Sequence, residues 1–273
     1  MKLNERQAPL LARWEAFMGK IKGRHDEILT EAGAGLGALL KEDPTGHAPC
    51  MNAINAIKMR VIKLTEKIDQ AWSDDVGGRF RDARSGQAMP DFDDVGIEKM
   101  EEVQHFLSER WERFRCGWEA HIFRTLWPHV KAAMDRPTSC SQCGARLSPE
   151  VCHRSVNVNC DSCGSLNTII PDTIVGTYFS SGPHHFAQEA ALERRLAIDR
   201  YRHEVDLERR YRGWPTESRA SLEKWEAMEE GYWREYAAVR RQVNGESEDS
   251  AEAFVQSRIQ AFRERHLAAE PNW

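Results

Sequence analysis

The sequence predicts a mainly α protein, a bundle of long, coiled-coil-like helices with a small β insert. Apolar residues recur at alternating steps of three and four over most of the chain, as they do on the buried face of an amphipathic helix. Charged residues make up 30% of the 273 residues, and the mean hydropathy is −0.64, which is typical of long solvated helices. The helical spacing disappears between residues 138 and 170, where Ser, Asn, Val and Cys predominate.

Three helices are predicted in an N-terminal helical region, residues 1–137. The first has apolar positions at heptad spacing from Leu11 to Leu39, and the second has them from Ile54 to Ala71. Asp43, Pro44 and Gly46 lie between them and favour a turn, so we expect the two helices to be antiparallel.

A loop is predicted from Ser73 to Asp94, because this stretch is rich in Gly, Asp, Arg and Ser and has no apolar period. The third helix follows, with apolar positions from Ile97 to Ile122. Pro128 should kink or end it, because proline cannot donate the backbone hydrogen bond that the helix needs.

The insert, residues 138–170, has strand-like content from Val151 to Val158. A Gly-, Ser- and Pro-containing linker is predicted over residues 171–183. A C-terminal helical region of three helices, residues 184–273, should follow it. Its first helix is expected from His184 to Arg212, with opposite charges four residues apart, as in Arg195 and Asp199.

Trp214 and Pro215 should end that first helix. The second helix has apolar positions from Leu222 to Val243 and is followed by the stop signal Asn244-Gly245. The third should begin near Asp249, which has capping spacing to Glu252.

The charge balance excludes a strong global attraction to polyanions. The 38 basic and 43 acidic residues nearly cancel, so any binding to nucleic acid or to an anionic membrane would have to be local. The N-terminus has no uninterrupted apolar run of the kind a secretory signal contains, and no segment approaches the length of a membrane span. We therefore expect a cytoplasmic protein that does not bind a membrane.

Four of the seven cysteines form two CxxC pairs, and each pair is followed by glycine. The pairs are Cys140 with Cys143 and Cys160 with Cys163, separated by sixteen residues. Two residues between cysteines allow one tight turn to present both thiolates to one ion, and two such turns complete a tetrahedron. Glycine accepts a positive φ, which lets backbone N–H groups turn toward the sulfurs.

This stretch resembles the zinc-ribbon superfamily, in which two CxxC knuckles on short β-hairpins bind one zinc ion. The resemblance covers about 33 of the 273 residues and implies one structural Zn²⁺ held by Cys140, Cys143, Cys160 and Cys163. Iron in a rubredoxin-like site and a redox CxxC are the alternatives, but a redox site needs only one motif and a βαβ context. Four thiolates leave no position open for water or substrate, which favours a structural ion.

Other metal-ligating or polar residues are predicted to have ordinary roles. Glu102 and His105 form an ExxH motif, and with the cysteines they give a superficial similarity to rubrerythrin, but no second ExxH is present. His25 lies on a helix seam and is expected to be a hydrogen-bonded core residue. His184 and His185 are expected to be exposed or capping residues. Cys50 and Cys116 should pack as small apolar groups. Cys152 and His153 are expected to be strand residues or neighbours of the metal ligands.

The function that the sequence favours is that of a non-enzymatic zinc-binding interaction or scaffold protein, with the ribbon as a docking platform for a protein partner or a second copy of the chain. One alternative is a nucleic-acid-associated or transcription-related factor. It is not favoured, because residues 138–170 contain no Phe, Tyr or Trp for base stacking. The second alternative is a metal or redox enzyme with its site in the helical bundle.

Overall fold

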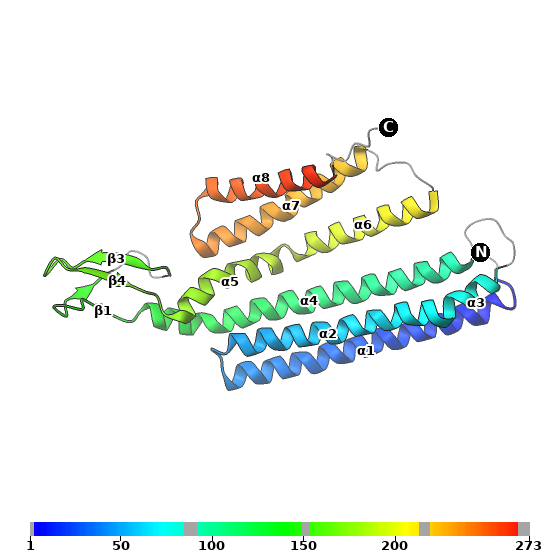
Figure 1. The fold of residues 1–273 in the computed structure, drawn as a ribbon, viewed down its shortest axis with the longest axis horizontal. Helices are drawn as coiled ribbons and strands as arrows, with labels where there is room; N and C mark the ends of the chain where they lie inside the picture. The colour runs from blue at the N-terminus through cyan, green and yellow to red at the C-terminus, as the bar shows by residue number, and fades with distance from the viewer. Residues whose placement is uncertain (1–2, 85–91, 149–152, 213–218, 267–273) are drawn as a thin grey trace. The chain divides into compact units, whose positions relative to one another are not determined.

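The computed structural model describes residues 3–84, 92–148, 153–212 and 219–266. Figure 1 shows that most of the described chain is helical, with two small antiparallel hairpins between residues 138 and 169. The predicted fold class, mainly α with a small β insert, is therefore confirmed, whereas coiled-coil geometry stays a prediction. Within the described ranges, every helix falls short of the length or the apolarity that a membrane crossing demands.

The chain divides into two compact units, and the division does not follow the order of the sequence. The first unit holds the described parts of residues 1–42, 48–115 and 206–214, and the second holds those of 43–47, 116–205 and 215–273. The helix α4 (Phe92–Met134) contributes to both. The predicted division into four consecutive regions stays a prediction apart from the corrections below.

The first unit is built from α1 (Gln7–Glu42), most of α2 (His47–Ala71) and the N-terminal part of α4. Figure 1 shows α1 and α2 running side by side in opposite directions, as predicted. Polar contacts connect the helices at their margins: Trp14 Nε1 donates to the Gly96 carbonyl at 3.0 Å, and Arg110 pairs with Asp26 at 2.7 Å. The buried apolar residues of α1 and α2 are Trp14, Met18, Ile21, Ile28, Leu29, Ala32, Leu36, Leu40, Cys50, Ile54, Ile57, Val61, Leu64 and Ile68.

The predicted loop from Ser73 to Asp94 is wrong over residues 73–82 and again over residues 92–94, where α4 has already begun. Residues 72–76 form a π-helical turn, η1 (Trp72–Val76), and α3 (Gly77–Asp82) follows it; residues 85–91 lie outside the described residues. Aromatic packing explains the helix, because Phe80 is fully buried between Trp72 and Phe92, with ring centroids 5.3 and 4.6 Å away. Burying such rings outweighs the weak local preference of Gly and Asp for turns.

Pro128 was expected to end or kink the third helix. It does not end the helix, because α4 continues to Met134. Leu126 and Val130 on either side of the proline are fully buried, against Val175 and Tyr178 of the second unit. Apolar burial on both sides of the proline therefore holds the helix together despite the lost hydrogen bond.

The linker predicted over residues 171–183 is also wrong, because α5 (Thr173–Ala190) includes most of it, with Pro183 inside the helix. The Asp172 side chain caps the helix by accepting from the Ile174 backbone N–H at 3.1 Å. Val175, Tyr178 and Gly182 lie at helical spacing on its buried face. Gly182 allows close approach, since a Cβ there would lie 3.2 Å from the Phe123 ring.

Four helices therefore follow the hairpins in the described residues, not three: α5, α6 (Leu192–Arg212), α7 (Arg219–Asn244) and α8 (Glu248–His266). Trp214 and Pro215 lie outside the described residues. The predicted end of α7 is confirmed, because Gly245 has φ of 66°. The cap of α8 is Ser247, whose Oγ accepts from the Ser250 N–H at 3.2 Å, and not Asp249.

Candidate metal centre

The cysteine segment, residues 138–170, consists of two hairpins with the same loop geometry. β1 (Thr138–Ser139) pairs with β2 (Arg146–Leu147), and β3 (Val156–Asn159) pairs with β4 (Leu166–Ile169). The strand predicted from Val151 is shorter than expected and begins at Val156.

Each CxxCG loop is closed in the same way. The N–H of the first cysteine donates to a carbonyl five residues later, from Cys140 to Ala145 and from Cys160 to Ser165, at 2.8 Å in both loops. Gly144 and Gly164 have φ of 73° and 71°, as the glycine after each knuckle predicts.

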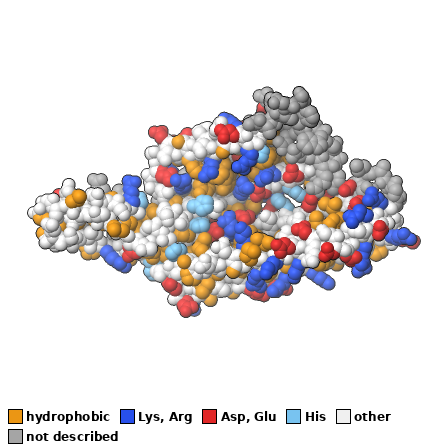
Figure 2. Space-filling view, in the orientation of Figure 1, with side chains coloured by type: hydrophobic (Ala, Val, Ile, Leu, Met, Phe, Trp, Pro, Cys, Tyr) orange, Lys and Arg blue, Asp and Glu red, His pale blue; other side chains and the backbone are white. Residues whose placement is uncertain are grey.

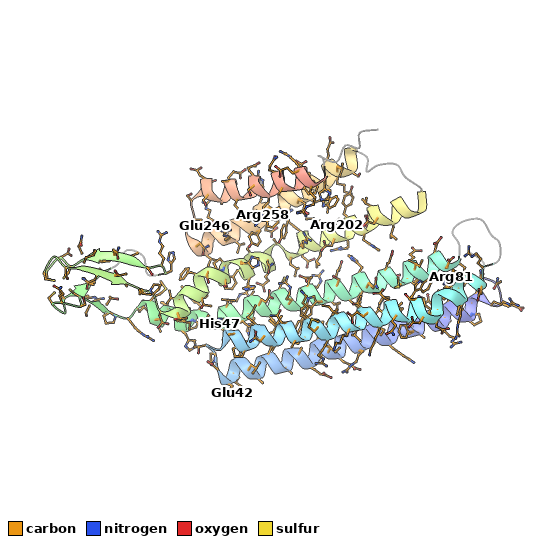
Figure 3. All side chains as sticks on the ribbon, viewed as in Figure 1. Glu42, His47, Arg81, Arg202, Glu246 and Arg258 are labelled. Carbon is orange, nitrogen blue, oxygen red and sulfur yellow. The ribbon has the colours of Figure 1, made fainter. Side chains whose placement is uncertain are left out.

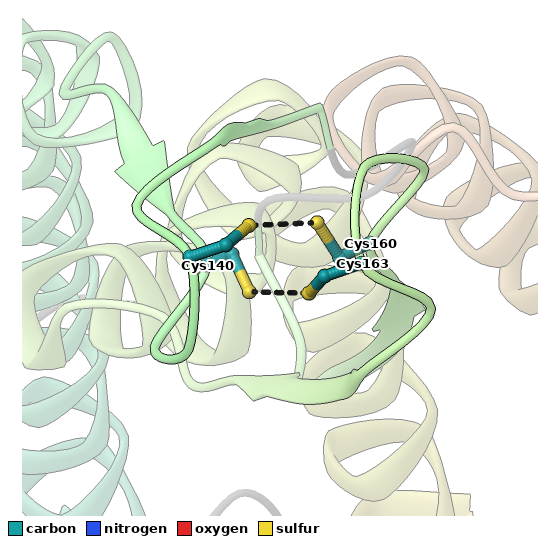
Figure 4. Close-up of side chains that lie close together, drawn as sticks. Cys140, Cys160 and Cys163 are labelled. Carbon is teal, nitrogen blue, oxygen red and sulfur yellow. Dashed lines mark hydrogen bonds between the residues drawn. The ribbon is translucent and has the colours of Figure 1, made fainter.

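The two loops bring the four thiols together, as Figure 4 shows. Cys140 Sγ lies 3.7 Å from Cys163 Sγ, Cys143 Sγ lies 3.6 Å from Cys160 Sγ, and all four sulfurs lie within 4.8 Å of one another. Four sulfurs bound tetrahedrally at about 2.3 Å from one ion would be about 3.8 Å apart. The spacing of the cysteines therefore fits a single tetrahedral ion of that size.

Polar neighbours of the sulfurs complete the cluster. Ser165 Oγ lies 3.1 Å from both Cys140 Sγ and Cys163 Sγ, and the Gln142 N–H donates to Cys140 Sγ at 3.4 Å. Asn167 joins the two hairpins, because its Nδ2 donates to Cys140 Sγ at 3.5 Å and its Oδ1 accepts from the Ser141 N–H at 2.9 Å. Such contacts orient metal ligands and stabilise their thiolate form.

The thiols cannot all ionise on their own. Hydrogen bonding from Ser165, with help from backbone N–H groups, lowers the pKa of Cys140 to about 5, and Ser165 also lowers the pKa of Cys163. The Ala145 N–H acts in the same direction on Cys143, but hydrogen bonding with the other cysteines raises its pKa to about 12. A bound cation would remove this conflict, because its charge stabilises all four thiolates together.

The rest of the cysteine segment is partly apolar and partly exposed. Cys140, Cys160 and Leu147 form a small buried cluster, whereas Cys143 and Cys163 are exposed. Leu166 and Ile170 are 63% and 75% exposed, so an apolar surface lies on the second hairpin and just beyond it.

The remaining candidate ligands are not at this cluster. Cys152 lies outside the described residues, and His153 precedes the strand and stacks on Phe179 of α5 at 4.7 Å. Glu102 pairs with Lys99 at 2.9 Å, and His105 lies 3.2 Å from Glu109 on the same helix. In the part of the chain that the structure describes, no other group of three His, Cys, Asp or Glu side chains converges at ligand distance.

The histidine pair at 184 and 185 differs from the expectation of exposed or capping residues. His185 is largely buried, and its Nδ1 lies 3.1 Å from the buried carboxylate of Glu119. The Phe123 ring stacks on the His185 ring, with centroids 4.9 Å apart. His184 is exposed as expected, but its Nδ1 hydrogen-bonds the Tyr236 hydroxyl. Cys50 and Cys116 are buried, as predicted for packing residues.

His25 is buried as expected but is not hydrogen-bonded. It is fully buried, and neither ring nitrogen has a hydrogen-bond partner among the described residues. Its nearest carboxylate oxygen, on Asp26, is 4.0 Å away. Burial lowers the pKa of this imidazole below its ordinary value, because the charged form loses hydration.

We predict that His25→Leu stabilises the first unit and removes part of its sensitivity to acid. In the native chain the unfolded state takes up a proton below its pKa of about 6.5, but the buried ring does not. His25 therefore has no pH-dependent effect on the free energy of unfolding well above that pH. As the pH falls through it, protonation of the unfolded state lowers the free energy of unfolding. Filling the site with an apolar side chain should add about 1–3 kcal/mol by removing the unsatisfied nitrogens.

Urea unfolding at neutral and mildly acidic pH measures both effects as the difference between variant and native chain. His121→Leu, at an exposed position on α4, is the matched control and should not gain the stability expected of His25→Leu, because no buried polar group is removed there. An unchanged pH dependence for His25→Leu would contradict the prediction.

Fold and site together define a mainly α protein with a four-cysteine cluster compatible with one metal ion. Comparison with known proteins found no matching family model, no matching curated protein and no matching solved structure. The resemblance to the zinc-ribbon superfamily therefore stays a prediction from the two CxxCG motifs.

Proposed function

We propose that the cysteine cluster holds one structural zinc ion, in the manner of a zinc ribbon. The observation that carries this proposal is the separation of the sulfurs, 3.6 and 3.7 Å across the two loops, which is close to the edge of a tetrahedron around Zn²⁺. Hydrogen bonds from Ser165 and Asn167 to the sulfurs support it, because thiolate ligands of zinc need such donors.

The ion has a structural and not a catalytic role in this proposal. Four cysteine ligands fill the tetrahedron, and a zinc ion that activates water needs an open position. Closed cysteine sites contribute folding free energy to small segments that have little core of their own. The cysteine segment is of this kind, since among its described residues the buried cluster contains Leu147 and two cysteines, with Val158 and Ile169 only partly buried against them.

The protein as a whole acts, in our proposal, as a non-enzymatic helical adaptor. It binds a protein partner through the cysteine segment, which the zinc ion stabilises. The exposed side chains of Leu166 and Ile170 supply apolar contact area, which is expected at the centre of a protein interface. The visible face in Figure 2 carries basic and acidic side chains intermingled. That distribution supports a protein partner over nucleic acid, which favours a continuous basic surface.

We predict that the purified chain carries about one zinc ion per molecule and little iron, since one four-thiolate site holds one ion. Elemental analysis and native mass spectrometry measure this, and the Cys143→Ser and Cys163→Ser double variant is the control that should lose the ion. A chain that is metal-free with its cysteine segment still folded would refute the zinc proposal.

A further inference from the structure

A cavity of about 360 Å³ lies in the second unit, lined by residues of α5, α7 and α8. Its size is within the range of small-molecule sites. No aspartate or glutamate is among the described residues that line it, whereas Arg240 and Arg258 are. The lining therefore has a positive charge that the cavity itself does not neutralise.

Aromatic rings hold the arginines in place. The Arg258 guanidinium lies 5.0 Å from the ring centroids of both Trp233 and Phe254, and the Arg240 guanidinium lies 5.0 Å from that of Phe254. Trp233 and Phe254 themselves meet edge to face at 5.8 Å. Stacked guanidinium groups are weakly hydrated and present their N–H groups in the plane of the fork, an arrangement suited to carboxylates and phosphates.

The two arginines differ in whether they already have a partner. Arg240 is bonded to Glu246 of the α7–α8 turn, with nitrogen–oxygen distances of 2.8 and 3.0 Å. Arg258 pairs with no carboxylate in the described part of the chain. Figure 3 labels Arg258 on α8 and Glu246 at the connection between the helices. Arg258 is thus the cation at this cavity that a ligand can still neutralise.

The other side of the cavity offers neutral polar groups and further rings. Tyr232 and Tyr236 are buried, and burial raises the pKa of both phenols, to about 12 for Tyr232. They therefore stay uncharged and do not repel an anion. Gln188 and Asn244 are neutral and line the same space, and the Asn244 Nδ2 donates to Glu246 Oε1 at 3.1 Å.

We propose that this cavity binds a small organic anion with a flat ring, its carboxylate or phosphate held by Arg258 and its ring packed among Trp233, Phe254 and Pro183. The free charge of Arg258 and the aromatic lining account for the two parts of this ligand, its anionic group and its flat ring. The unneutralised arginine selects for negative charge, and the aromatic lining favours a flat apolar body. This site is separate from the cysteine cluster and does not depend on the role proposed for it.

The test uses the full zinc-loaded chain and two pairs of probes, each an anion and a neutral molecule with the same ring system: adenosine 5′-monophosphate with adenosine, and 2-naphthoate with 2-naphthol. Isothermal titration calorimetry should detect binding of at least one anion, about tenfold or more tighter than its neutral counterpart. Arg258→Gln should weaken binding of that anion by about tenfold or more, and Arg258→Lys should weaken it less because charge is retained.

Arg234→Gln is the matched control, because Arg234 lies on α7 and pairs with Glu230 and Glu252 away from the cavity. Circular dichroism checks that each variant is folded. The proposal is overturned if neither anion binds more tightly than about 1 mM, if the neutral probes bind as well as the anions, or if Arg258→Gln weakens binding no more than Arg234→Gln does.

Discussion

Replacing Cys160 with serine should abolish tight zinc binding and open residues 138–170 to proteolysis, while most of the helical circular dichroism survives. Serine is a poor zinc ligand, and three thiolates bind the ion much less tightly. The hairpins of this segment have strands of two and four residues, too short to be stable without the metal. The helices have buried faces of their own and do not depend on it.

Elemental analysis, limited proteolysis with mass spectrometry and far-UV circular dichroism measure these effects. Ser162→Ala changes an exposed residue of the same loop and is the matched control, which should keep zinc and protease resistance. Global unfolding of Cys160→Ser would show that the segment is part of the main core and not a module.

The same variant tests the docking surface. Affinity capture from the native host should recover a partner with the native chain and with Ser162→Ala, and lose it with Cys160→Ser, because the surface around Leu166 and Ile170 depends on the hairpins. Retention of the partner by folded, zinc-free Cys160→Ser would place the docking surface on the helices instead.

Long helices with one regular buried face could be predicted from the sequence. On α1 and α2 the residues at heptad spacing, from Trp14 to Leu36 and from Ile54 to Ile68, are those that the structure buries. Their periodicity extends over many turns, so a few exceptions such as the exposed Leu39 do not hide it.

Segments whose helicity depends on distant contacts could not be predicted. Gly182 and Pro183 disfavour a helix locally, yet both are buried in α5, with Gly182 close to Phe123 of α4. The turn at Trp72–Val76 is held in the same way by rings that are distant in sequence, including Trp14 at 5.5 Å. In a helix interior glycine costs about 1 kcal/mol and proline about 3 kcal/mol relative to alanine, and the burial of several large apolar side chains offsets such costs.

The four-cysteine cluster could be predicted from the sequence, but its polar surroundings could not. The spacing of the cysteines identifies all four, because two CxxCG motifs are specific. Ser165 and Asn167 carry no comparable signal, since the first loop has Ala145 where the second has Ser165. The cavity at Arg258 was missed because Tyr236 and Phe254 fit a helix seam equally well.

Replacing Gly96 with alanine should destabilise the first unit by about 1–3 kcal/mol, the usual range for overpacking a closed interior. A Cβ at this buried position of α4 would lie 2.5 Å from the Trp72 ring and 2.8 Å from the Phe80 ring. The rings are themselves packed against Trp14 and Phe92, so neither can move without disturbing another. Urea unfolding followed by circular dichroism measures the loss.

Gly35→Ala, in α1 of the same unit, is the matched control and should have the opposite sign. No heavy atom lies within 4 Å of a Cβ at Gly35, so alanine meets no obstacle there. It should stabilise the unit by about 0.5–1 kcal/mol because it reduces the backbone freedom of the unfolded chain. If Gly96→Ala were stabilising as well, then helix propensity would outweigh the aromatic contacts, and the packing of Trp72 and Phe80 could not be the reason that residues 72–82 are helical.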